Sequence, residues 1–170
     1  TTAQHVADQL GEHIPYILDG GAAEVGVEST IIGWEHDRWV LYRAGGVALE
    51  RLEEVVGTVD PGMKPVRPVA PGMLESHYAP RKRVYVGDVS SLLKEHEGRR
   101  VGVIAFRTTY PTYRNEVLSP TGDLAEAARH LFAVLRELDA SDVEVILAEV
   151  FPDVGLGRAI NDRLRRAAAR

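Results

Sequence analysis

The sequence contains no cysteine among its 170 residues, which excludes disulfide bonds, thiolate metal sites and a cysteine nucleophile. No apolar run approaches the roughly 18 residues that a membrane-spanning helix needs, and no signal-peptide pattern stands at the start. Neither half of the chain is strongly basic, as a dedicated nucleic-acid binder would be. From these absences we expect a globular protein of the cytoplasm that enters no membrane.

Basic residues are scarce in the first half only. Residues 1–80 hold 5 Lys and Arg against 12 Asp and Glu, whereas residues 81–170 hold 15 against 13. The formal net charge of −5 therefore divides into −7 and +2. This unequal division predicts two units that meet near residue 80.

The first 60 residues predict too few elements for a core of their own. The chain has no initiator Met and enters helical sequence at once, with Thr1 and Gln4 at capping-box spacing. Hydrophobic spacing predicts helices over 2–12 and 48–56 and strands over 16–18, 25–34 and 39–43. Since a hairpin with two short helices cannot bury a stable core, we expect this segment to join a larger sheet of a longer protein.

A proline-rich connector follows this incomplete unit. Residues 58–82 hold five of the nine prolines, which rules out a helix or a central strand there. The segment is longer than an ordinary connection, so it is a disordered linker or a functional loop. Its centre is the stretch PGMLESHYAP, residues 71–80.

From residue 83 onward, apolar strands alternate with amphipathic helices. Strands are predicted over 84–86, 101–106, 116–118 and 143–150, and helices over 89–97, 123–138 and 158–169. This alternation predicts a parallel sheet with right-handed crossovers, a small Rossmann-like unit. The predicted fold class is α/β, with a unit over 1–60, a linker over 61–82 and a Rossmann-like domain over 83–170.

Three patterns in the sequence suggest a ligand but have simpler explanations. Gly155-x-Gly157 stands before a helix like a phosphate cradle, but it lacks a third glycine, so a turn and helix start is the simpler interpretation. The six histidines show no metal-ligand spacing, and no metal site built by this chain alone is expected. Arginines in the last helix fit helix solvation, with RNA contact left open; they are Arg158, Arg163, Arg165, Arg166 and Arg170.

Polar side chains in the predicted hairpin are better candidates for a binding site. Ser29 and Thr30 place two adjacent hydroxyls on an expected strand, facing opposite sides. No base adjoins either in sequence, which gives a serine nucleophile no support but leaves a substrate-binding hydroxyl open. Arg43 ends an apolar strand beside a glycine turn and suits a phosphate or carboxylate, although a surface arginine is the simpler interpretation.

Taken in order, these pieces resemble one known family. The series is DGG at 19–21, GVESTI at 26–31, LYRAGGV at 41–47, APGM at 70–73 and HYAP at 77–80. It resembles the two-domain L-threonylcarbamoyladenylate synthases, which have a YrdC-like catalytic domain, a linker and a Rossmann-like C-terminal domain. The resemblance extends through GLGRAI at 155–160 and so covers nearly the whole chain.

The resemblance implies a nucleotidyltransferase and a set of binding residues. The family makes threonylcarbamoyl-AMP from L-threonine, bicarbonate and ATP for the threonylcarbamoyladenosine modification of tRNA. By position, Ser29 resembles the residue that contacts L-threonine, and Arg43 and Tyr78 resemble ATP-binding residues, with Thr30 and His77 as second choices. Mg²⁺ would be held by the phosphates, and no catalytic residue is assigned. Ala44 replaces the proline usual after the arginine, which alters loop stiffness more than charge.

The resemblance is incomplete at the front. The basic motif and the Ser-Ala-Asn-like segment of the YrdC-like domain are both absent, so we expect this chain to lack the N-terminal part of the catalytic domain and to be inactive alone. Possible partners are tRNA and tRNA-modification proteins. The alternatives left open are an RNA- or nucleotide-binding module without catalysis, and a passive lid that only holds the linker in place.

Overall fold

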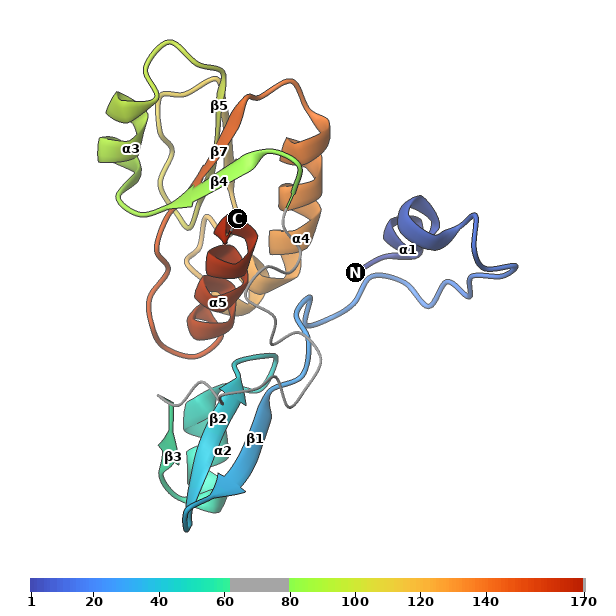
Figure 1. Ribbon diagram of the computed structural model, residues 1–170, viewed down its shortest axis with the longest axis vertical. Helices are drawn as coiled ribbons and strands as arrows, with labels where there is room; N and C mark the ends of the chain where they lie inside the picture. The colour runs from blue at the N-terminus through green and yellow to red at the C-terminus, as the bar shows by residue number, and fades with distance from the viewer. Residues whose placement is uncertain (62–79, 170) are drawn as a thin grey trace.

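The computed structural model describes residues 1–61 and 80–169, arranged as an N-terminal part (1–61) and a C-terminal part (80–169). In Figure 1 the C-terminal part lies above the small sheet of the N-terminal part. The centre of the proline-rich connector, with His77 and Tyr78, lies outside the described residues. Within the described ranges, no helix combines the length and apolar character needed to cross a membrane.

The C-terminal part is built on a four-stranded parallel sheet, as the alternation of strands and helices predicted. The strand order is β4-β7-β5-β6, and every neighbouring pair is parallel. The strands are β4 (Arg83–Val86), β5 (Val101–Ala105), β6 (Arg114–Val117) and β7 (Val145–Ala148). Because β7 enters between β4 and β5, the last strand in the chain is central in the sheet.

Helices cover both faces of this sheet, so its central strands are buried on both sides. They are α3 (Val89–Glu95), α4 (Leu124–Ala140) and α5 (Gly157–Ala168). Alternate side chains along the strands point to opposite faces. Ile104 and Ile146 therefore share one apolar cluster with α4 and α5, whereas Val103 and Leu147 share the other with α3. The α/β class with a parallel sheet is confirmed.

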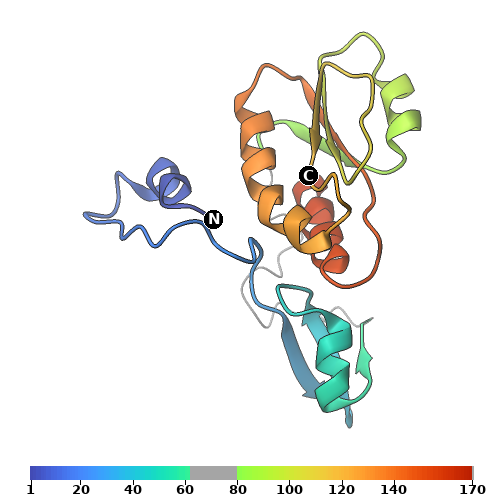
Figure 2. The same ribbon diagram turned by 180° about the vertical axis from the view of Figure 1, so that it is seen from behind.

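The N-terminal part is a small mixed sheet beside one helix. Strands β1 (Ile31–Glu35) and β2 (Arg38–Arg43) form an antiparallel hairpin, and β3 (Val59–Asp60) pairs with β2 in parallel. The helices are α1 (Ala3–Leu10) and α2 (Leu49–Val56). Figure 2, seen from behind, shows α1 set apart from both sheets, and α1 has no buried residue.

Several predictions for the N-terminal part were wrong in detail. The strand expected over 16–18 is irregular chain, and Leu18 is 97% exposed. The strand expected over 25–34 begins only at Ile31, because the preceding residues bond to a turn instead of a strand. The N-cap of α1 is Thr2, whose hydroxyl accepts a hydrogen bond from the His5 amide at 3.2 Å, and not Thr1. Strand β3 was not predicted, because two residues are too few to show the alternation of apolar and polar side chains.

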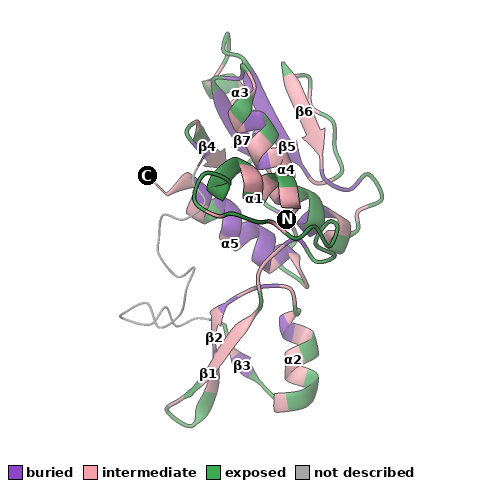
Figure 3. Ribbon diagram, turned by 90° about the vertical axis from the view of Figure 1, so that its right-hand side faces the viewer, coloured by how far each residue is buried: buried purple, intermediate pink, exposed green. Residues whose placement is uncertain are grey.

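Helices α4 and α5 of the C-terminal part face the N-terminal part. Gly26, with a φ of +76°, lies so close to Ala128 and Arg129 of α4 that a Cβ would overlap the helix backbone. Glu28 pairs with Arg163 of α5, and Glu50 of α2 pairs with Arg158 of the same helix. Figure 3 shows α5 as a largely buried helix between the two sheets. The acidic and basic halves of the sequence thus meet through carboxylate–guanidinium pairs.

Candidate functional site

The predicted site residues Arg43 and Ser29 are in direct contact. Arg43 ends β2, and its Nε donates a hydrogen bond to the Ser29 carbonyl oxygen at 3.0 Å. Its Nη2 donates to the Ser29 hydroxyl at 3.1 Å. Arg43 is only 8% exposed, so the interpretation of it as a surface arginine was wrong. Two groups that lie 14 residues apart in the chain therefore form one polar unit.

A hydrogen-bonded turn after β2 holds the Ser29–Arg43 unit in place. The Gly46 amide donates to the Glu28 carbonyl oxygen at 2.8 Å. The Thr30 hydroxyl donates to the Val47 carbonyl oxygen at 2.6 Å and accepts from the Val47 amide at 3.0 Å. Gly45 lies against the backbone of residues 28 and 29 without room for a Cβ. Residues 28–30 are thus fixed to the turn that follows Arg43.

The two neighbouring hydroxyls have different roles in this arrangement. Thr30 uses its hydroxyl as donor and acceptor on the backbone of Val47, which makes it a structural residue of the turn. Ser29 is exposed, and its hydroxyl accepts from Arg43 while its own proton stays available to a ligand. A hydroxyl beside a guanidinium suits a carboxylate or phosphate oxygen, which accepts from both.

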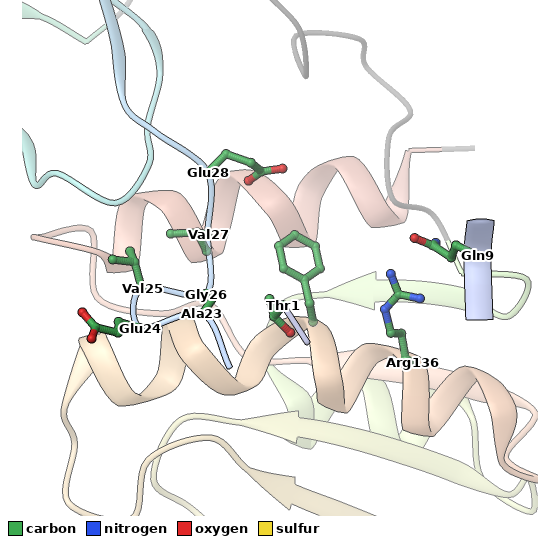
Figure 4. Close-up of a pocket in the computed structure, with 10 residues that line it drawn as sticks. Thr1, Gln9, Ala23, Glu24, Val25, Gly26, Val27, Glu28 and Arg136 are labelled. Atoms are coloured by element: carbon green, nitrogen blue, oxygen red, sulfur yellow. The ribbon is translucent and has the colours of Figure 1, made fainter. Parts of the chain in front are cut away.

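A pocket of about 860 Å³ lies next to this unit, between residues 23–28 and α4. Figure 4 shows Arg136 rising from α4 toward Gln9, and the segment 23–28 passing over the helix. The pocket lining ends at Glu28, so it contains neither Ser29 nor Arg43. Its size is that of a small-molecule site, but of its polar lining residues only Glu28 adjoins the predicted binding pair in sequence.

The glycine motif and the arginines of α5 have structural explanations. Gly157 lies against the Pro152 carbonyl without room for a Cβ, and Gly155 has a φ of +52°. The Gly155 amide donates to a Glu50 carboxylate oxygen at 3.4 Å, so a side chain of the N-terminal part occupies the place of a ligand anion. Carboxylates also pair with three of the arginines proposed for RNA contact, namely Arg158, Arg163 and Arg166.

A second, smaller pocket of about 330 Å³ lies at the carboxyl ends of β4 and β7. Two of its polar side chains bond to each other, since Glu149 accepts a hydrogen bond from the Tyr110 hydroxyl, and Glu149 also accepts from the Phe106 amide. Burial, together with the bond to Glu149, raises the pKa of Tyr110 to about 12. Sequence reasoning missed this pair, because residues 110 and 149 meet only through the order of the strands.

The pairs Glu28–Arg163 and Glu50–Arg158 were also missed. The only signal for them was the charge difference between the two halves, which does not name individual residues. Bonding from Arg158 lowers the pKa of Glu50, as expected for a carboxylate that accepts from a guanidinium. No group of three or more His, Asp or Glu side chains suited to a metal ion occurs in the part of the chain that the structure describes.

Comparisons with known proteins now decide the family. The family model for the C-terminal domain of threonylcarbamoyl-AMP synthase matches residues 47–169. The chain belongs to the threonylcarbamoyl-AMP synthase family. Synthases from Bacillus subtilis and Pyrococcus abyssi are 37% and 38% identical to it over 99% of this chain. The resemblance that the sequence motifs indicated is confirmed.

A solved structure supports the same assignment. The crystal structure of Pyrococcus abyssi Sua5 complexed with L-threonine matches 99% of this chain with a TM-score of 0.86 and 38% identity. A variant of that protein in which a His and a Tyr are replaced by Ala matches with a TM-score of 0.85. The chain spans about half the length of the curated relatives it matches, 53% for both synthases above.

Proposed function

We propose that this chain contributes the binding groups for L-threonine and ATP to a synthase that makes threonylcarbamoyl-AMP for tRNA modification. The observation that carries the proposal is the buried Arg43 guanidinium bonded to the hydroxyl and carbonyl of the exposed Ser29. The relative with 38% identity that was solved with L-threonine supports a threonine site in this fold. In this proposal Ser29 binds L-threonine and Arg43 binds ATP.

The chemistry of the product explains why these two groups are neighbours. The amino group of L-threonine forms a C–N bond to bicarbonate with loss of water, which gives a carbamate. A carbamate oxygen then forms a bond to the α-phosphorus of ATP while the bond to pyrophosphate breaks. Both substrates must therefore lie within reach of one another. Ser29 fixes the amino acid, and the forked guanidinium of Arg43 offsets phosphate charge. Mg²⁺ would be held by the phosphate oxygens of ATP.

The connector residues Tyr78 and His77 complete the proposed ATP site, with Tyr78 over the nucleotide and His77 as the second choice. They form the only adjacent His-Tyr pair in the sequence. A solved relative carries Ala in place of a His and a Tyr. This variant supports the proposal that a His-Tyr pair contributes to function. We place the reaction in the cytoplasm, with tRNA and tRNA-modification proteins as proposed downstream partners.

Pyrophosphate release dependent on ATP, L-threonine and bicarbonate tests this function. The assay uses a synthase of the relatives' full length that contains this chain, here called the full-length synthase. Replacing Ser29 by Ala is expected to raise the KM for L-threonine about tenfold, as loss of one hydrogen bond to a charged group does. Arg43→Lys is expected to lower kcat/KM at least about tenfold, because Lys lacks the forked donor geometry.

Arg38→Lys is the matched control, since Arg38 lies on the same strand but pairs with Asp60 at the surface. Its kcat/KM should stay near the wild-type value. Equal losses for Arg38→Lys and Arg43→Lys would contradict the proposal. The 170-residue chain by itself should release no pyrophosphate above background, and turnover by it would contradict that expectation. The alternative of an RNA-binding module is weakened by the ion pairs of α5, and a salt-dependent gel shift with tRNA tests it.

A further inference from the structure

Arg163 is an unusually buried charge at the boundary between the two parts of the molecule. It lies in the middle of α5 and is 1% exposed. Its Nε donates to Glu28 at 2.8 Å, across the boundary, and its Nη1 donates to Asp162. Its Nη2 is buried and has no hydrogen-bond partner among the residues that the structure describes. The Arg163 side chain therefore bonds across the boundary, although one of its guanidinium nitrogens has no acceptor among the described residues.

Stability alone is a poor explanation for this arrangement. Removing the Arg163 guanidinium from water costs several kcal/mol, and attraction to a partly exposed carboxylate such as Glu28 often fails to repay it. Apolar side chains of similar volume at such places are frequently as stabilising or more so. In some proteins the role of such an ion pair is instead to fix one geometry, because one arrangement satisfies both charges.

The geometry fixed here is that of the proposed binding residues. Glu28 immediately precedes Ser29, and its carbonyl oxygen accepts from the Gly46 amide at 2.8 Å. Two residues earlier, Gly26 lies directly against the backbone of α4. The segment 26–29 is thus held by α4 and α5 on one side and by the turn after Arg43 on the other.

We propose that Arg163 is a positioning residue that sets the place of Ser29, and with it the contact to Arg43, from helix α5 through Glu28. The C-terminal part then takes part in substrate binding without touching substrate. The inference rests on the proposed function, because it gives Ser29 the role of binding L-threonine. A displacement of about 1 Å at such a group is enough to cost up to about a hundredfold in rate.

The neighbouring pair on the same helix provides a matched control. Arg158 also lies on α5 and also pairs with a carboxylate of the N-terminal part, Glu50. Glu50 belongs to α2, however, and neither residue bonds to the segment 26–29. Loss of either arginine weakens the boundary between the parts, but of the two only Arg163 bonds to the residue next to Ser29.

The experiment compares Arg163→Met and Arg158→Met in the full-length synthase, with Arg163→Lys as the conservative variant. For Arg163→Met we expect the KM for L-threonine to rise about tenfold or more. Arg158→Met should stay within about twofold of wild type. Arg163→Lys, which retains the charge that Glu28 pairs with, should recover part of the loss.

A second readout does not depend on turnover. Amide hydrogen exchange in the 170-residue chain should become faster at Gly46 and Val47, whose amides donate to Glu28 and Thr30, in Arg163→Met and should stay unchanged there in Arg158→Met. If Arg163→Met fails to fold, Glu28→Gln replaces it, since it keeps the shape but removes the charge. Equal effects of the Arg163 and Arg158 variants in both readouts would overturn the inference.

The design separates this inference from the function on which it rests. A wild-type full-length synthase without threonine-dependent pyrophosphate release contradicts the proposed function. A wild-type enzyme that turns over, with an unchanged KM for L-threonine in Arg163→Met, contradicts the positioning role alone. A Ser29→Ala variant with normal KM contradicts both, because Arg163 would then position a residue without a role.

Discussion

The two parts of the molecule differ in how they bury their apolar residues. In the C-terminal part every residue of β5 and β7 is buried between helices on the two faces of the sheet. In the N-terminal part large apolar side chains stay exposed, among them Tyr16, Leu18, Trp34 and Val55. The C-terminal part supplies its own core, whereas the N-terminal part depends on the turn at 44–47 and on ion pairs with α5. The proposed binding residues Ser29 and Arg43 lie in the N-terminal part, which has the smaller core of its own.

The sharpest test of this difference uses the same substitution in both parts. Leu131 lies fully buried on α4, and Leu131→Ala should lower the free energy of unfolding by about 2–5 kcal/mol, through lost burial and a cavity. Leu18→Ala, at an exposed position, should change it by less than about 0.5 kcal/mol. Urea unfolding of the 170-residue chain measures both. Similar losses of unfolding free energy in the two variants would contradict the difference in apolar burial between the two parts.

A smaller effect is expected at the boundary between the parts. Because bonding from Arg158 lowers the pKa of Glu50, the ionised carboxylate stabilises the folded state. This contribution is fully present above the ordinary pKa of 4.5 and is lost as the pH falls through the lower folded pKa. Wild type should therefore exceed Glu50→Gln in stability near neutrality, and the difference should shrink on acidification.

Thermal unfolding across acidic pH checks this prediction. Glu54→Gln is a suitable control, since Glu54 lies on the same helix and pairs only with the nearby Arg51 at the surface. A difference between wild type and Glu50→Gln that stays constant down to low pH would show that charge at Glu50 contributes nothing to the boundary.

The smallest effect is expected inside the C-terminal part, at Tyr110. Its pKa of about 12 lies above the ordinary 10.0, so the protonated hydroxyl stabilises the fold. That contribution is fully present below pH 10 and is lost as the pH rises through about 12. Tyr110→Phe should lower stability by about 1 kcal/mol near neutrality, the usual worth of one hydrogen bond.

Spectrophotometric titration of tyrosine gives the direct measurement. Wild type should contain a tyrosine that ionises later than the others, and Tyr110→Phe should lack it. Retention of that late-titrating tyrosine in the variant would assign it to another residue and contradict the pair with Glu149.

The same difference between the parts explains what the sequence could predict. Helix α4 and strand β7 were predictable because their buried apolar residues recur with the period of the helix or strand itself. On α4 these residues include Leu131, Leu135 and Leu138. The segment 16–18 was mispredicted as a strand because β-favouring residues there have no strand to pair with. Pairing of β2 with β3 through only two residues leaves no periodic signal.

The candidate site was predicted in part for a related reason. Ser29 and Arg43 were named because they stand in ordered motifs, but their contact depends on a turn that brings residues 14 positions apart together. Arg163 and Glu28 lie 135 residues apart, and no local pattern marks such a pair. Long-range ion pairs are set by topology, so the charge difference between the halves predicted two units with a boundary near residue 80 but not which residues pair between them.

A crystal structure of the full-length synthase with L-threonine and a non-hydrolysable ATP analogue would show whether Ser29 and Arg43 bind the two substrates. We expect a polar atom of L-threonine to lie within hydrogen-bond distance of the Ser29 hydroxyl. We also expect the Arg43 guanidinium to donate to a phosphate oxygen while its contact with Ser29 persists. Both ligands bound elsewhere, with Ser29 and Arg43 contacting neither of them, would contradict the account.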